Sequence, residues 1–564
     1  MVLELDRIQG RVVPGFNKQY EAFVLVEFSS GIAGREWLRE LRHDDIWEIT
    51  TADEVAQFKT LRKRAEVRRR GEEASLISST WLNVAFSRAG LQLLLETRRT
   101  DLLGDARLDP RFTATHHAVG RNPARPVHAL VIIAADRPLD LDREVDRQVE
   151  RLTGHGLQAI ETFRGHLLRD GREHFGYRDG LSQPPIMGAP QTSAAEPGVP
   201  LQPGEFVLGY PDELGERIVA DADLTRNGSF LVFLKLKQDV AGFATAIRDH
   251  AAEAGLQPEQ LGAALVGRNR EGQHVGPPFE RLSHITRAHP EPADVPDDPQ
   301  RHRILRRGIP YGPALGTGAD DEERGLLFVA YQADIVRQFQ HVWEKWLHNP
   351  NFPDPDVGRD PLVGPATSPD GGRAVTVARG DAKGGTQRLT LTQFVTPQYG
   401  GYFFTPSTDA LARLAGLSVP PDSVQLQESP QPMPPRTVFV NLTGSPAKPD
   451  YLDLVLRENP YDINPDRVSL PNIAEVDGPA RDFQRGRRYP GGRSLNEFLG
   501  MAAARGDSAD ALLPFPHWRH NNQDYRISKS MLLTYNYNNP ADAPTPAFSG
   551  IILIGYGGPV WGGP

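Results

Sequence analysis

Three stretches of this 564-residue chain contain side chains suited to acid–base or metal chemistry, and the first surrounds Asp179. Asp179 lies in the run 174–185, between an arginine and a glycine, and Gly176 and Gly180 favour a turn over a helix. A carboxylate on such a turn can accept a proton from a substrate. Asp-Gly is also a common surface turn, so the stretch alone leaves both interpretations open.

The other two stretches lie later in the chain. His284 follows Leu282 and Ser283, and a loop histidine can ligate a metal, although an isolated one is more often a solvated surface residue. Arg306 lies in the arginine-rich run 301–312, and a guanidinium there can stabilise negative charge because it stays protonated. His289 and His302 are nearby, and both are rival candidates for a ligand.

Composition excludes several classes of chemistry. There is no cysteine, so disulfides, thiolate nucleophiles, iron–sulfur clusters and thiolate-ligated or covalent c-type haem are excluded. Any haem is therefore non-covalent, with His, Met or Tyr as its axial ligand. The net charge of -9 gives no basic field for nucleic acid, and no apolar run is long enough to span a bilayer. The first residues lack a signal-peptide pattern, which predicts a cytoplasmic protein.

Strand-then-helix patterns that could position these side chains recur four times. Runs of apolar residues predict strands, and each is followed by a pattern of helical period, at about 20–41, 129–152, 229–254 and 325–347. Two such units in each half predict an α+β fold built from a duplicated β-α-β-β-α-β module, the ferredoxin-like arrangement. A doubly wound parallel sheet is the alternative, but the chain has no glycine-rich phosphate loop and few helix-separated strands.

Proline-rich stretches suggest where the chain divides. The run 185–203 connects the two halves, and the Pro/Gln/Ser-rich run 419–435 follows the second half. We therefore expect ferredoxin-like domains at 1–200 and 201–418. Residues 419–564 are expected to form a C-terminal extension, in which we find no catalytic motif.

Taken together, these motifs resemble one known family, the dye-decolourising (DyP-type) peroxidases. The resemblance covers about residues 5–415, and its main segments follow the family's order. They are Phe175-Gly-Tyr-Arg-Asp-Gly (the GxxDG motif), Ser283-His-Ile, Ile304-Leu-Arg-Arg-Gly-Ile-Pro-Tyr-Gly, Arg324-Gly-Leu-Leu-Phe-Val and Asp360-Pro-Leu-Val-Gly. GxxDG alone is a weak signal, whereas the ordered set is a strong one.

The resemblance implies a dimeric α+β barrel-like fold with one haem b, bound non-covalently in the second half. It implies that His284 is the iron ligand and that Asp179 and Arg306 form the distal pair. The residue types agree, because a carboxylate can shuttle the proton between the peroxide oxygens and an arginine can stabilise the developing charge. Arg306 should also lower the pKa of Asp179.

The remaining implied residues surround the haem. Leu326 and Phe328 resemble walls of the distal pocket. The proximal histidine needs a hydrogen-bond acceptor for its other ring nitrogen, and Asp360 is our candidate. Many family members use a surface Trp or Tyr as an electron relay, for which Trp346 is the candidate. Trp343 and Trp346 at helical spacing more often form the core face of a helix.

Three positions depart from the family pattern. Thr286 stands where a basic residue often lies two places after the histidine, with Arg287 following it. Leu234 replaces a frequent arginine, and Gly401 a frequent acidic residue. The first two leave the contacts to the haem propionates open, but none of the three alters the expected iron ligand or distal pair.

These observations predict a haem peroxidase that reduces hydrogen peroxide and oxidises organic donors such as dyes or phenolic compounds. The alternative is a haem-binding or haem-handling protein with little peroxidase turnover. A third, weaker interpretation is a metal-dependent hydrolase that uses His284 and Asp179. We expect no nucleic-acid or membrane partner, while homo-oligomerisation and the physiological electron donor are left open.

Overall fold

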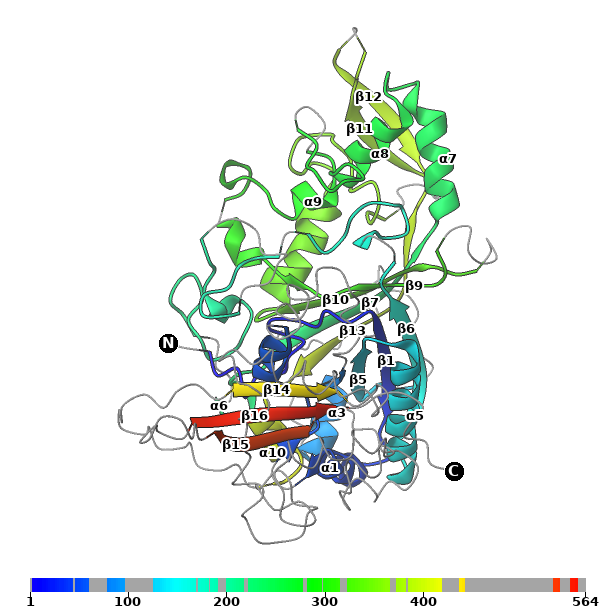
Figure 1. The fold of residues 1–564 in the computed structure, drawn as a ribbon. Helices are drawn as coiled ribbons and strands as arrows, with labels where there is room; N and C mark the ends of the chain where they lie inside the picture. Colours follow the sequence, from blue (N-terminus) through cyan, green and yellow to red (C-terminus); the bar gives the residue numbers. More distant parts are fainter. Residues whose placement is uncertain are drawn as a thin grey trace, which may run out of the picture. The chain divides into compact units, whose positions relative to one another are not determined.

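The computed structural model describes most of residues 3–417 and three short strands beyond them (Figure 1). The described residues are 3–43, 46–59, 79–96, 125–168, 171–181, 183–190, 199–217, 222–276, 281–296, 298–314, 322–365, 372–381, 384–417, 436–441, 531–537 and 548–555. The chain divides into two compact units. The first comprises Met1–Arg42, Asn83–Ile132 and Val149–Ser418, and it contains every candidate site residue.

A nine-stranded sheet carries both predicted halves. Its order is β6-β1-β5-β4-β13-β7-β10-β8, and β9 pairs with β10. The strands of the first half are β1 (Tyr20–Glu27), β4 (Thr80–Phe86), β5 (Ala129–Ala135) and β6 (Gln158–His166). Those of the second half are β7 (Ser229–Gln238), β8 (Leu305–Arg306), β9 (Ile309–Tyr311), β10 (Gly325–Gln332) and β13 (Val395–Thr405).

The strand order confirms the duplicated ferredoxin-like fold. In each half the fourth strand is followed by the first, the third and the second, with β8 and β9 together in the second position of the later half. This is the order of a β-α-β-β-α-β unit. The pairs β1–β6, β7–β10 and β7–β13 are antiparallel, so the doubly wound parallel alternative is wrong.

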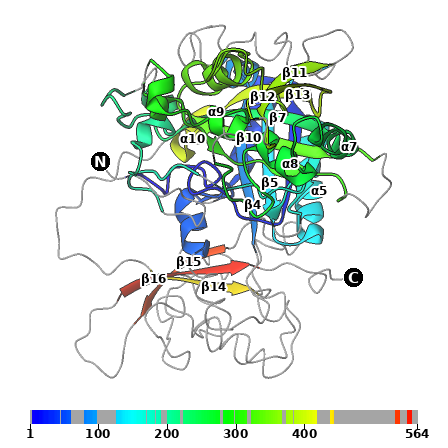
Figure 2. The ribbon, with the colours of Figure 1, turned by 90° about the horizontal axis from the view of Figure 1, so that it is seen from above.

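The helices follow the predicted pattern with shifted ends. Ser30 caps α1 by accepting a hydrogen bond from Ala33 N, and Trp37 lies on the buried face of this helix. In both views α7 (Val240–Ala251) and α8 (Pro258–Val266) lie side by side (Figures 1 and 2). The helices are α1 (Gly31–Glu40), α3 (Arg88–Leu94), α5 (Pro138–Gly154), α6 (Ala222–Thr225), α7 (Val240–Ala251), α8 (Pro258–Val266), α9 (His284–Arg287) and α10 (Thr408–Leu414). None of the described helices has both the length and the apolar character needed to cross a bilayer.

The helix after β10, η6 (Val336–Leu347), has the wide π form rather than the expected α form. Its hydrogen bonds join residues five apart, as from Gln340 N to Ile335 O (2.9 Å) and from His348 N to Trp343 O (3.1 Å). Long π-helices are rare, and single π turns are found mostly at functional sites.

Smaller elements complete the described structure. In the first unit, β11 (Arg373–Ala378) and β12 (Thr386–Leu391) form a hairpin beside α7 and α8 (Figure 1). Short strands β2 (Arg42–His43) and β3 (Ile46–Trp47) pair with each other. The second unit contains a three-stranded sheet in the order β14-β16-β15, made of β14 (Arg436–Asn441), β15 (Met531–Tyr537) and β16 (Phe548–Gly555). The domain boundaries expected near 200 and 418 stay predictions.

An N-terminal segment before β1 joins the two halves of the sheet. The buried side chain of Gln9 donates from Nε2 to Val84 O in β4 (2.9 Å) and to Pro406 O, just after β13 (2.8 Å). Its Oε1 accepts from Val84 N (2.9 Å). Because β4 and β13 are the strands at which the halves meet, one amide fastens both halves at their junction.

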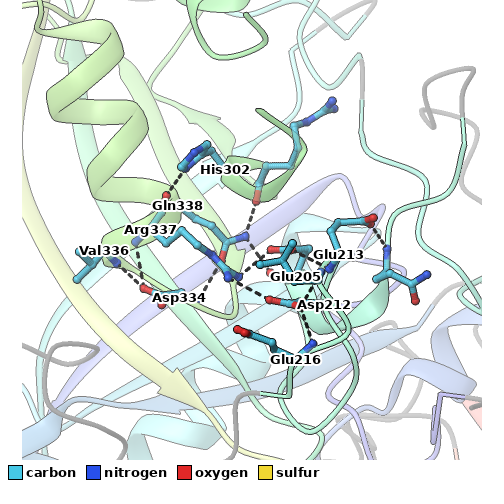
Figure 3. Close-up of polar contacts among 12 residues, drawn as sticks. Glu205, Asp212, Glu213, Glu216, His302, Asp334, Val336, Arg337 and Gln338 are labelled. Atoms are coloured by element: carbon cyan, nitrogen blue, oxygen red, sulfur yellow. Dashed lines mark hydrogen bonds and ion pairs between the residues drawn. The ribbon is translucent and has the colours of Figure 1, made fainter. Parts of the chain in front are cut away.

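A buried ion cluster fixes the start of η6 (Figure 3). The Arg337 guanidinium contacts two buried carboxylates, at 2.8 Å from Glu205 Oε2 and 3.1 Å from Asp212 Oδ2. Gln338 Nε2 donates to Glu205 O (2.8 Å), which ties the same loop to η6. Burial raises the pKa of Glu205 to about 7, opposed by Arg337 and reinforced by the Asp212 charge.

This cluster predicts that stability depends on pH through Glu205. In the folded protein the carboxyl stays protonated to about pH 7, whereas in the unfolded chain it ionises near its ordinary pKa of 4.5. The folded state thus holds the extra proton in this window, and its stability falls as pH rises through it. In Glu205→Gln, the difference in the free energy of unfolding between pH 5 and pH 8 should shrink by roughly 3 kcal/mol.

Denaturant unfolding at the two pH values measures this difference. Glu216→Gln is the matched control, because it removes an exposed carboxylate from the same loop, where the cluster uses only the Glu216 backbone. An unchanged pH dependence in Glu205→Gln would show that this carboxyl is ionised throughout the range.

Candidate active site

Asp179 lies at the end of a tight turn, as its flanking glycines predict. Gly176 and Gly180 both have positive φ, of 90° and 72°, which side-chain-bearing residues rarely adopt. Asp179 N donates to Gly171 O (3.0 Å), and Asp179 Oδ1 accepts from Gly180 N (2.7 Å). The Asp179 side chain is exposed, which leaves its carboxylate accessible to a small substrate.

Arg306 is hydrogen-bonded to the segment that follows Asp179. Its Nη2 donates to Leu181 O (2.9 Å), and its backbone N donates to Gln183 Oε1 (3.2 Å). Arg306 is thereby brought next to Gln183 and Leu181, which lie 123 and 125 positions before it in the sequence. The structure places the two predicted distal residues in one neighbourhood, joined through Leu181 and Gln183.

The predicted pocket walls lie on the same face of the sheet as Arg306. Arg306 pairs with Ala330 in β10, and residues directly opposite on antiparallel strands project to one face. Leu326 and Phe328 share that face with Ala330 because side chains alternate along a strand. Both are only half-buried, whereas Leu327 between them is fully buried. This gives an apolar, accessible surface beside a guanidinium.

Behind Arg306, on the opposite face, half-buried Arg307 joins a cluster of charged residues with buried Arg11 and Glu21. Arg307 and Arg11 each donate a hydrogen bond to the backbone oxygen of the other. Arg11 Nη2 donates to Arg307 O (2.6 Å), and Arg307 Nε donates to Arg11 O (3.3 Å). Arg307 Nη1 also donates to Arg306 O (3.1 Å). Glu21 pairs with Arg11 and supplies the negative charge. Burial lowers the pKa of Arg307 to about 10.

Gly15 explains how the N-terminal segment approaches Arg307 so closely. A Cβ atom at Gly15 would lie 2.2 Å from Arg307 Nε, and its φ is +85°. Any other residue would therefore displace the guanidinium that supports the Arg306 backbone.

His284 and Asp360 form the second cluster of the site. His284 begins α9, and its Nδ1 lies 3.7 Å from Asp360 Oδ2. Asp360 is fully buried, and its Oδ1 accepts from Leu362 N (3.0 Å) and Val363 N (2.7 Å). These two bonds hold the carboxylate in one orientation, with its other oxygen directed at the imidazole. The structure thus brings together two predicted residues that are 76 positions apart.

Two buried arginines frame this pair. Arg287 donates to the backbone oxygens of Leu282 (2.7 Å) and Gly358 (2.7 Å), and so joins the His284 segment to the loop before Asp360. Arg373 Nη1 donates to Asp360 O (3.2 Å). Burial lowers the pKa of both arginines to about 10, and the Asp360 charge opposes this. Arg287 is engaged with backbone oxygens, so the contacts to the haem propionates stay open.

The His284–Asp360 pair has the properties of a haem-ligand pair. Within the described part of the chain, His284 Nδ1 and Asp360 Oδ2 are buried and have no hydrogen-bond partner. The Nδ1 edge faces the carboxylate, and 32% of the His284 side chain is exposed, so the opposite nitrogen is available to a metal. The residues present therefore fit a haem iron.

The rival residues do not share these features. His289 Nδ1 contacts Ile285 O at 2.8 Å, and buried His302 contacts Arg337 O at 2.5 Å. Trp346 is 3% exposed and lies edge-on to His302, at 5.0 Å between ring centroids. It therefore belongs to the packed face of η6, as the helix-core interpretation predicts, and the surface position expected of a relay is wrong.

Several groups in the site were missed by the sequence reasoning, among them Arg307 and Glu173. Arg307 stands in the quoted motif, and strand alternation would have placed it opposite Arg306. Glu173 stands one residue before the quoted Asp179 stretch. Its carboxylate accepts hydrogen bonds from Phe175 N (2.9 Å) and Tyr177 N (3.0 Å), inside the turn that leads to Asp179. The local signal that could have found it is the spacing of an acceptor side chain three residues before a turn glycine, here Glu173 before Gly176.

Comparisons with known proteins point to one family. A model for the DyP dimeric alpha+beta barrel domain matches residues 7–168, and one for the Dyp-type peroxidase C-terminal region matches residues 218–354. A multifunctional dye peroxidase of Amycolatopsis sp. is 30% identical over 371 residues, which cover 54% of this chain and 78% of that protein. The dye-decolorizing peroxidase msp1 of Mycetinis scorodonius is 27% identical over 471 residues, covering 72% and 87%.

Solved structures show the same fold. An ancestral D-type dye-decolorizing peroxidase superposes with a TM-score of 0.58 and 26% identity, covering 73% of this chain and 99% of that one. A dye-decolorizing peroxidase in complex with 2,6-dimethoxyphenol has the same TM-score, with 25% identity, and covers 73% and 100%.

The fold and the site define a peroxidase of the dimeric α+β barrel class. The chain belongs to the family of dye-decolourising (DyP-type) peroxidases. Members of this family depend on haem, so the interpretation as a metal-dependent hydrolase fails. The described residues also contain no group of three or more His, Cys, Asp or Glu side chains that could hold a metal ion.

Proposed function

We propose that this peroxidase uses one non-covalent haem b, held by His284 Nε2, with Asp179 and Arg306 on the distal side. The single observation that carries the proposal is the His284–Asp360 pair, in which a fully buried carboxylate faces Nδ1 at 3.7 Å. When bound, the haem supplies the iron at which the O–O bond of peroxide is cleaved and through which organic donors are oxidised. The absence of cysteine supports the non-covalent form.

Each residue has a definite task in this scheme. The negative charge of Asp360, 3.7 Å from His284 Nδ1, favours the tautomer that carries its proton on Nδ1 and leaves the lone pair of Nε2 free for the iron. The Asp179 carboxylate accepts a proton from one peroxide oxygen and returns it to the other, the leaving oxygen. Arg306 stabilises the negative charge that develops as the O–O bond breaks. Leu326 and Phe328 provide an apolar surface that excludes water.

The co-substrates follow from the same scheme. Hydrogen peroxide is the oxidant, and dyes or phenolic compounds are the electron donors, as supported by the phenol complex of a similar structure. The cytoplasmic location expected from the sequence stays a prediction, which fractionation of the native cells checks.

An absorption spectrum of the purified protein before and after one equivalent of peroxide tests the proposal. We expect a Soret band that changes within the mixing time and returns to its starting form when a phenol is added. A Soret band that does not respond to peroxide would indicate haem binding without turnover, which was the alternative from the sequence. No Soret band after reconstitution with haemin would refute His284 as a ligand.

A further inference from the structure

Three turns in the first unit share one construction. In each, the first and last of seven residues form an antiparallel bridge, and the fifth residue is a glycine with positive φ. The bridges are Arg172 with Arg178, Pro211 with Arg217, and Arg268 with His274, and the glycines are Gly176, Gly215 and Gly272. The three sequences differ at most positions, so the features that all three share indicate what this turn geometry requires.

The second residue of each turn is a side-chain acceptor that bonds the turn's own backbone. Asp212 Oδ1 accepts from Leu214 N and Glu216 N, both at 2.9 Å, and Asn269 Oδ1 accepts from Gln273 N (2.8 Å). Because a neutral amide serves in the third turn, the construction requires an acceptor and not a charge.

In the first turn the acceptor is Glu173, and this turn leads directly to Asp179. Besides Phe175 N and Tyr177 N, the Glu173 carboxylate accepts from Gln238 Nε2 at 2.8 Å. Gln238 is the last residue of β7, so this bond anchors the turn to the sheet. Glu173 therefore fixes the backbone of the turn and also attaches the turn to the end of β7.

We propose that Glu173 is the positioning residue of Asp179, acting through the turn 172–178 and its anchor on Gln238. The inference rests on the proposed function, in which Asp179 moves the proton of peroxide. Burial raises the pKa of Glu173 to about 7, reinforced by the Asp179 charge and opposed by the hydrogen bonds that the carboxylate accepts. Its two oxygens share these bonds, Oε1 accepting from Tyr177 N and Oε2 from Phe175 N and Gln238 Nε2, so a glutamine keeps one acceptor oxygen and an alanine keeps none.

The test measures the reaction of the haem-loaded enzyme with peroxide by stopped flow in the Soret region. Glu173→Ala should keep its Soret band and react on the order of 100-fold more slowly, the loss expected from displacing a catalytic group by about 1 Å. Glu173→Gln should react at a rate between those of wild type and Glu173→Ala, because it keeps one of the two acceptor oxygens. Asp212→Ala removes the same acceptor from the second turn and is the control, with lower stability and an unchanged rate.

A double variant separates positioning from general damage. If Glu173 acts through Asp179, adding Glu173→Ala to Asp179→Asn changes the rate no further. A further drop in that background, or a wild-type rate in Glu173→Ala alone, overturns the proposal. If Glu173→Ala fails to fold, Gln238→Leu is measured instead, because it removes only the anchor of the turn. Its rate must fall at least severalfold, and neither a change of buffer nor a change of pH should restore it. Wild-type reactivity of Asp179→Asn would instead refute the proposed function itself.

Discussion

His284→Ala is expected to purify with little or no haem and without peroxidase turnover. The imidazole is the proposed iron ligand, and loss of a partner one step further out, such as Asp360, already costs roughly 10- to 100-fold in metal affinity. Losing the ligand itself should cost more. Titration with haemin, followed at the Soret band, measures the affinity, and added imidazole should restore part of the band by occupying the vacated position.

His289→Ala is the matched control for this experiment, because it removes a histidine from the same segment whose Nδ1 contacts Ile285 O. It should bind haem as wild type does. If His284→Ala retained full haem affinity while His289→Ala lost it, the ligand assignment would have to be exchanged between the two.

Asp179→Asn is expected to keep its haem and to react with peroxide roughly 100- to 10,000-fold more slowly, the range for loss of a general acid–base group. Asparagine has the same shape as aspartate but cannot accept the peroxide proton. The second-order rate with peroxide should fall, while the affinity for the organic donor changes little. Stopped-flow rates and steady-state donor kinetics separate the two effects.

Arg178→Gln provides the control for Asp179→Asn, since it changes the charge of the exposed neighbouring side chain and leaves the turn glycines in place. Its rate should stay near that of wild type. An Asp179→Asn enzyme that reacts as fast as Arg178→Gln would assign the proton transfer to another group.

Much of the fold was predictable because its elements are strongly periodic. The buried runs of β5, β7 and β10 and the helical periods that follow β1, β5, β7 and β10 could be read from the sequence. The duplicated order of strands followed from counting these units. Strands β8 and β9 have two and three residues, too few for any period to appear, although β8 carries Arg306. The π form of η6 depends on its packing and leaves no sequence signal.

The predicted site residues were recognised by the order of their motifs, whereas their supports were not. His284 and Asp360 face each other across 76 residues, and that contact was proposed from motif position alone. Glu173 accepts from the backbone of its own turn, whereas Arg11 and Arg307 donate to backbone oxygens of distant segments. Such hydrogen bonds depend on three-dimensional proximity, and a single sequence carries no pattern that reports it.

The contacts of Gln9 have a consequence for how the protein is made. Gln9 leaves the ribosome near the start of synthesis, but its partner Pro406 O follows 397 residues later. At about 5–20 residues per second, roughly 20 to 80 seconds separate the two. Arg11 likewise cannot donate its hydrogen bond to Arg307 O until Arg307 has been synthesised. We therefore expect the first half to remain open at this edge until the second half has emerged, so that the two halves mature together and Arg306, the neighbour of Arg307, is positioned last.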